Sequence, residues 1–126
     1  MQSSCATVRA VDAPRVHWRG IVLDELTEAE LTRASFSIIA LDGDGRVVAT
    51  SASAGRWAGV TAWQLRGREL TRELAWRLGE DATLRLVAFL NGSRASATLR
   101  VAGRRGSADA DLTVLRGASR RYLVLG

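Results

Sequence analysis

The sequence predicts an α/β domain with a mixed sheet, whose elements follow one another as strand, strand, strand, helix, strand, helix, strand. Three observations lead to this fold class. Short runs of aliphatic and β-branched residues flank one long segment with helical periodicity. A turn rich in aspartate and glycine, residues 42–45, separates two of these runs. The length of 126 residues suits one domain, for which we expect residues 16–126 after an N-terminal extension, residues 1–15.

The first three strands are expected in the N-terminal half. Val16–Leu23 is apolar enough for a first strand and ends in the acidic, helix-favouring stretch Asp24–Glu30. Ser35–Leu41 and Arg46–Ser51 are two β-type runs joined by the turn at residues 42–45. Because aspartate and glycine tolerate the positive φ angles of tight turns, we expect these two runs to form an antiparallel hairpin.

A glycine-containing loop, residues 54–60, should lead into the main helix, Ala62–Leu78. Thr61 with Gln64 three residues later has the pattern of a capping box, and Gly79 is a helix-ending residue. Large apolar residues recur at intervals of three or four, which predicts one buried helix face. This face consists of Trp63, Leu70, Leu74 and Leu78.

In the last third of the sequence, we expect further strands, with one segment that is either a helix or a strand. Thr83–Leu90 is the clearest strand there, followed by a turn at residues 91–93. Arg94–Ala102 has both alternating and helix-favouring residues, so it is either a second helix, as in the order given above, or a return strand. Leu112–Leu115 and Tyr122–Leu125 are predicted as the closing strands.

Composition narrows the function classes. The hydrophobic fraction is 47% and the charged fraction 25%, typical of a packed domain, and no apolar run is long enough for a membrane span. All 18 basic residues are arginine, and the net charge is +5. Arginine binds phosphate through a bidentate fork, so a basic chain of this kind favours a nucleic-acid partner.

We expect no catalytic residues, no metal and no cofactor. Cys5 and His17 are the only residues of their types, too few for an internal disulfide or a usual zinc site. The turn at residues 42–45 is no calcium loop, because Arg46 stands where an oxygen ligand is required and Ser53 where a glutamate is required. The element order is similar to that of ribonuclease H-like proteins, but with Asn91 in place of an acid the carboxylate cluster of a nuclease is missing.

The segment Ser35–Gly55, SFSIIALDGDGRVVATSASAG, resembles the central hairpin of small-subunit ribosomal protein eleven. The resemblance continues with fewer matched positions to about residue 119. Arg56 is what remains of that family's basic loop, and the family's basic C-terminal tail is missing. Large-subunit ribosomal protein eighteen has a similar hairpin, but the glycine after Ser53-Ala54 favours the small-subunit family.

This resemblance implies a ribonuclease H-like topology and a structural role in the ribosome, binding small-subunit rRNA at the platform beside neighbouring ribosomal proteins. It implies no membrane and no small-molecule substrate. The shortened RNA-binding elements suit an organellar ribosome, so a mitochondrial location is expected, with a cytoplasmic one as the alternative. The alternatives for function are a large-subunit protein eighteen-like rRNA binder and a non-ribosomal protein-interaction domain with a degenerate ribonuclease H-like fold.

The expected rRNA contacts are arginines that neutralise phosphates and one aromatic ring that stacks on a base. These are Arg56, Trp57, Arg66, Arg68, Arg72, Arg94, Arg104, Arg105, Arg116, Arg120 and Arg121.

Overall fold

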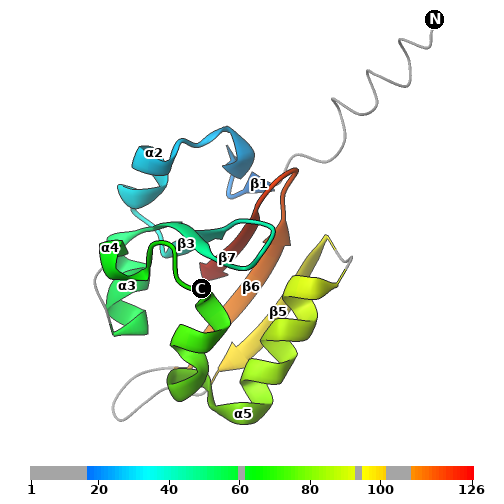
Figure 1. The fold of residues 1–126 in the computed structure, drawn as a ribbon. Coiled ribbons are helices and arrows are strands. Elements are labelled where there is room, and N and C mark those ends of the chain that lie inside the picture. The colour runs from blue at the N-terminus through cyan, green and yellow to red at the C-terminus, as the bar shows by residue number, and fades with distance from the viewer. Residues whose placement is uncertain (1–16, 60–61, 93–94, 102–108) are drawn as a thin grey trace, which may run out of the picture.

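A five-stranded sheet forms the centre of the molecule (Figure 1). The computed structural model describes residues 17–59, 62–92, 95–101 and 109–126. The expected N-terminal extension, residues 1–15, and the capping residue Thr61 lie outside them. The sheet has the order β4-β3-β7-β6-β5. Its strands are β3 (Ile38–Leu41), β4 (Val47–Thr50), β5 (Ser96–Val101), β6 (Ala110–Arg116) and β7 (Arg121–Leu125).

All neighbouring strands of this sheet run antiparallel. The β3–β4 hairpin confirms the interpretation of residues 35–51, and the alternative of a return strand for residues 94–102 is the one observed, as β5. The last strand, β7, lies in the middle, paired with β3 on one side and β6 on the other. The prediction of a mixed sheet with ribonuclease H-like topology is therefore wrong, since the described residues contain no parallel strand pair.

The N-terminal elements form a small cap on one face of the sheet, which we call the N-terminal cap (residues 17–32). It contains a hairpin of β1 (His17–Trp18) and β2 (Ile21–Val22), the 3₁₀ helix η1 (Leu23–Glu25) and helix α2 (Glu28–Thr32). The single strand predicted for Val16–Leu23 is thus wrong. Thr27 begins α2 with a complete capping box, because its side chain and that of Glu30 each accept a bond from the other's backbone N–H.

Helices on the opposite face differ most from the sequence prediction. Residues 54–60 were expected as a loop, but Ala52–Ala58 form helix α3. The predicted helix Ala62–Leu78 is interrupted after helix α4 (Ala62–Leu65), and helix α5 (Leu70–Asn91) replaces the strand predicted for Thr83–Leu90. No helix in the described ranges has both the length and the apolar character needed to cross a membrane.

Helix α5 bends sharply at Gly79, which has φ 84° and ψ 169°. This backbone conformation is open almost only to glycine. The bend divides α5 into a first arm, residues 70–78, and a second arm, residues 80–91, which form a V in Figure 1. The prediction that Gly79 ends a helix is correct for the first arm, but a second arm follows directly.

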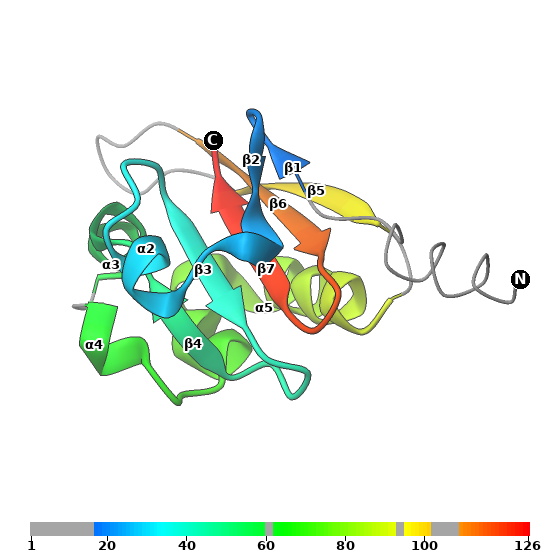
Figure 2. The same cartoon turned by 90° about the horizontal axis from the view of Figure 1, so that it is seen from above.

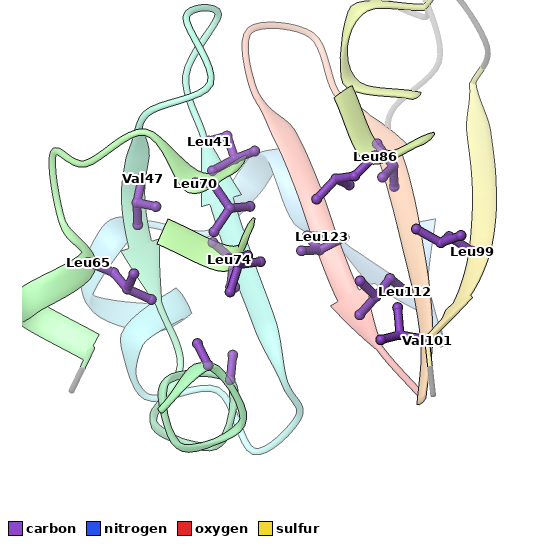
Figure 3. Packing of buried hydrophobic residues seen from close by; sticks show 14 residues of the cluster. Leu41, Val47, Leu65, Leu70, Leu74, Leu86, Leu99, Val101, Leu112 and Leu123 are labelled. Atoms are coloured by element: carbon purple, nitrogen blue, oxygen red, sulfur yellow. The ribbon is translucent and has the colours of Figure 1, made fainter. Parts of the chain in front are cut away.

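The helices α3 to α5 and the N-terminal cap cover opposite faces of the sheet (Figure 2), and an apolar core lies on each face. On the helical face, Leu70 and Leu74 of the first arm lie on the β3–β4 side, and Leu86 of the second arm lies on the β5–β7 side (Figure 3). On the other face, Leu23 and Leu31 of the N-terminal cap pack against alternate residues of the same strands. The strands are therefore apolar on both faces wherever both are covered.

Candidate functional site

The candidate site is a pocket of about 460 Å³ at the open end of the α5 bend. The β3–β4 turn, both arms of α5 and the start of β7 contribute to its wall. The lining residues are Asp42, Gly43, Asp44, Gly45, Glu69, Thr71, Val87, Leu90, Asn91 and Arg121. The bend at Gly79 turns the second arm of α5 back along the sheet (Figure 1), so Thr71 and Asn91, about twenty positions apart, both line this pocket.

One side of the pocket is acidic. Asp42 holds the turn in shape, because its Oδ1 accepts bonds from the backbone N–H groups of Asp44 at 2.8 Å and Arg46 at 3.0 Å. The side chains of Asp44 and Glu69 are exposed and form no ion pair within the described part of the chain. Three other described carboxylates do form ion pairs, namely Glu28 with Arg66, Glu73 with Arg68 and Asp111 with Arg100.

The other side of the pocket is basic and apolar. Arg121 is half-buried and donates from Nε to the Leu90 carbonyl at 3.4 Å. Its terminal nitrogens have no hydrogen bond or ion pair among the described residues, so they are free to bind an anionic group. Val87 and Leu90 supply apolar surface from the second arm. The pocket can therefore hold a small molecule that combines charged or polar groups with a short apolar part.

The pocket lining does not form a metal centre. In the described ranges no group of three or more histidine, cysteine, aspartate or glutamate side chains is arranged to hold a metal ion. The expectation that the chain needs no metal and no cofactor stays a prediction.

Among the predicted rRNA contacts, Arg121 lines this pocket and two others bind backbone carbonyls at the same end of the sheet. Arg116 donates to the carbonyl of Gly92 at 2.8 Å, and Arg120 to that of Leu26 at 3.1 Å. Arg116 and Arg120 were selected for their charge, but their side chains bind backbone carbonyls within the fold.

The remaining predicted contacts are spread over the molecule. Arg66 pairs with Glu28 of the N-terminal cap at 2.5 Å, and Arg68 bonds the Gln64 carbonyl at 3.0 Å. Trp57 is half-buried against the helical-face core, so it is not the exposed stacking ring that was expected. Arg56 on α3 and Arg72 on α5 are exposed, and Arg94, Arg104 and Arg105 lie outside the described residues.

Sequence reasoning missed most of the pocket. The turn at residues 42–45 was interpreted only as a hairpin turn, and Glu69 only in relation to a nuclease. The sequence signal at this site is a pair of acids, Asp42 and Asp44, in a turn of a basic chain. Nothing in the sequence connects that turn with Glu69, Leu90 or Arg121, because the contact depends on the bend of α5 and on the position of β7.

The fold is similar to that of PAS domains. The photoactive yellow protein domain of the sensor histidine kinase Ppr from Rhodospirillum centenum matches with a TM-score of 0.62 and 15% identity, over 82% of this chain and 94% of that domain. A PAS domain of an HTR-like protein from Haloarcula marismortui scores 0.47 at 19% identity, over 79% of this chain and 91% of that one. The fold assignment rests on the first of these. No family model and no curated protein matches the sequence.

These findings correct the functional assignment made from the sequence. A PAS fold, with its antiparallel sheet and a central last strand, is not the fold of small-subunit ribosomal protein eleven, nor is it ribonuclease H-like. The assignment to the ribosome is wrong, and so are the partners that followed from it, rRNA and neighbouring ribosomal proteins. The alternative of a non-ribosomal interaction domain fits better, without its ribonuclease H-like fold. The mitochondrial location was inferred from the ribosomal assignment and loses that support. The location itself stays a prediction.

Proposed function

We propose that this chain is a non-catalytic binding module that takes a small polar ligand in the pocket at the open end of α5. The observation that carries this proposal is the composition of the pocket wall. Free carboxylates of Asp44 and Glu69, the half-buried guanidinium of Arg121 and the apolar side chains of Val87 and Leu90 surround one space of about 460 Å³. A volume in this range suits a small organic molecule.

Ligand binding at this place would add a direct connection between the two arms of α5, which are joined through the bend at Gly79 and through their packing on the sheet. A ligand that contacts both arms of α5 stabilises their relative position, and a conformation of the arms that binds better becomes more populated. This arrangement supports a sensory role, as does the likeness to a domain of a sensor histidine kinase. The role proposed here replaces the expectation of no small-molecule substrate.

A thermal-unfolding screen tests the proposal. Purified protein is heated with each member of a panel of amino acids, small dicarboxylates and small amines. A compound that binds the folded state should raise Tm by roughly 8–14 °C at about 100 times its Kd, where binding stabilises the fold by about 2.7 kcal/mol. The shift should be lost in Arg121→Gln and retained in Arg100→Gln, because Arg100 pairs with Asp111 on a strand pair that does not line the pocket. A panel without a single shift, or equal shifts in Arg121→Gln and the wild type, would contradict the proposal.

A further inference from the structure

The two edges of the sheet differ in how they are closed. At the β4 edge, the segment 67–70 pairs with the start of the strand and satisfies the outer backbone groups of Val47. Val47 donates to the Arg68 carbonyl at 2.8 Å and accepts from the Gly67 N–H at 2.7 Å, and Leu70 donates to the Gly45 carbonyl at 3.1 Å. Another strand therefore cannot add to this edge at Val47.

The β5 edge is open within the described residues. Asp111 of β6 exchanges both backbone bonds with Gly126, at 3.2 and 3.0 Å, and the Arg116 N–H donates to the Ala95 carbonyl. Since bonding alternates along an antiparallel ladder, the odd-numbered residues of β5 bond to β6. The N–H and C=O groups of Ser96, Thr98 and Arg100 then point away from the sheet.

Strand β5 also lacks the usual protection of an edge strand. It contains no proline and no lysine, and its register with β6 is continuous from Ser96 to Val101 without a bulge. Its one charged residue, Arg100, is paired with Asp111 through contacts of 3.2 and 3.4 Å. A regular edge of this kind is a template for a further strand.

We propose that β5 pairs with β5 of a second copy of this chain, antiparallel and centred on Thr98. A two-fold axis at Thr98 makes the interface self-complementary. The outward backbone groups of Ser96, Thr98 and Arg100 meet those of Arg100, Thr98 and Ser96 of the second copy. The two five-stranded sheets then form one continuous sheet, and this assembly does not depend on the proposed ligand.

The side chains in this register are compatible. On the outer face, each Arg100 stands opposite the small, neutral Ser96 of the second copy and keeps its own partner, Asp111. On the helical face, the apolar Ala97 stands opposite Leu99 of the second copy. No like charges stand directly opposite each other, which would destabilise the pairing. A shift of the axis to Arg100 would place two arginines opposite each other, so charge disfavours that register, whereas the axis at Thr98 uses the outward groups of all three residues.

Sedimentation equilibrium of the full chain with matched charge variants tests this interface. Ser96→Arg places an arginine opposite Arg100 of the second copy, whereas Ser96→Asp places an acid there. Each dimer contains the altered pair twice, so we expect the dimer Kd to rise roughly two- to tenfold in Ser96→Arg and to fall by a similar factor in Ser96→Asp. Thr32→Arg, which adds the same charge on α2, should leave the Kd unchanged.

Thr98→Pro removes one outward N–H from each copy and leaves the backbone bonds to β6 in place, although it also removes the exposed side-chain bond to Thr113, and it should abolish the dimer. If this variant does not fold, the two Ser96 variants still test the proposed interface. A wild-type chain that stays monomeric at millimolar concentration would overturn the proposal. So would Ser96→Arg and Ser96→Asp variants that shift the Kd in the same direction, or that leave it unchanged.

Discussion

The hydroxyl of Tyr122 donates a 2.8 Å hydrogen bond to the carboxylate of Asp24, 98 residues earlier in the chain. The same carboxylate accepts the backbone N–H of Ala118 at 3.2 Å, and Arg120 donates to the carbonyl of Leu26 at 3.1 Å. Three bonds thus join the N-terminal cap to the end of the sheet at the β6–β7 turn. Because Tyr122 is fully buried, its hydroxyl requires such a partner.

Replacing Tyr122 with phenylalanine tests the strength of this connection. The ring stays buried, but Asp24 loses its hydroxyl partner, so Tyr122→Phe should lower the free energy of unfolding by about 0.5–2 kcal/mol in urea denaturation. Thr113→Val is the matched control. It removes a hydroxyl from the exposed Thr98–Thr113 pair and should cost less than about 0.5 kcal/mol. Equal losses in the two variants would show that the bond to Asp24 contributes no more than an exposed one.

The titration of Tyr122 gives a pH prediction. Burial, together with the hydrogen bond to Asp24, raises the pKa of Tyr122 from 10.0 to about 12. Since the pKa is higher in the folded state, this contribution to stability is fully present below pH 10 and is lost as the pH rises from 10 to 12. Tyr122 is the one tyrosine of the chain, so tyrosinate absorbance reports this group alone. A folded protein that titrates near pH 10 would contradict the buried hydrogen bond.

Gly117 is a second point of close contact between the cap and the sheet. A Cβ atom at this position would lie 2.8 Å from the Tyr122 ring and would collide with the Asp24 carboxylate. Gly117→Ala should therefore destabilise the protein by about 1–3 kcal/mol, measured by denaturant unfolding. Gly43→Ala is the control, because a Cβ there meets nothing within 4 Å. The packing of the cap would be wrong if both alanine variants were equally stable.

The helical-face core can be tested at Leu74, which is fully buried on the first arm of α5. Leu74→Ala should cost about 2–5 kcal/mol, since it removes buried apolar surface and leaves a cavity. Leu84 on the second arm is 63% exposed, so Leu84→Ala should change the free energy of unfolding by less than about 0.5 kcal/mol. The position of α5 would be contradicted if Leu84→Ala cost as much as Leu74→Ala.

The elements that could be predicted from the sequence have local signals. The β3–β4 hairpin was predicted because Asp42, Gly43 and Gly45 specify a turn between two β-type runs. Strand β7 was predicted from the short apolar run Tyr122–Leu125. In both cases the residues that decide the structure are close together in the sequence.

The second arm of α5 could not be predicted in the same way. Thr83, Val87 and Phe89 favour a strand locally, but Ala82, Leu86 and Phe89 recur at helical spacing and pack on the sheet as a helix. Tertiary packing overrides the local preference here. The break in the predicted helix likewise depends on a distant contact, because residues 67–70 pair with the edge of β4.

The functional error came from interpreting charge and one hairpin without the strand order. Arginines such as Arg116 and Arg120 were assigned to RNA, although they bind carbonyl groups within the fold. The position of β7 between β3 and β6, which distinguishes a PAS fold, follows from long-range pairing and has no sequence motif. Arg121 was selected for its charge alone, and only the fold places it beside Val87, Leu90 and the acidic turn.

The most direct test of ligand binding in the pocket is to locate the bound ligand. The ¹⁵N-labelled chain is titrated with the amino acids, small dicarboxylates and small amines of the thermal-unfolding panel, and amide chemical shifts are recorded. We expect saturable shifts that cluster at residues 42–45, 69–71, 87–91 and 121, the wall of the pocket. Shifts confined to the outer face of β5 and β6, or no shifts at millimolar ligand, would contradict binding in the pocket.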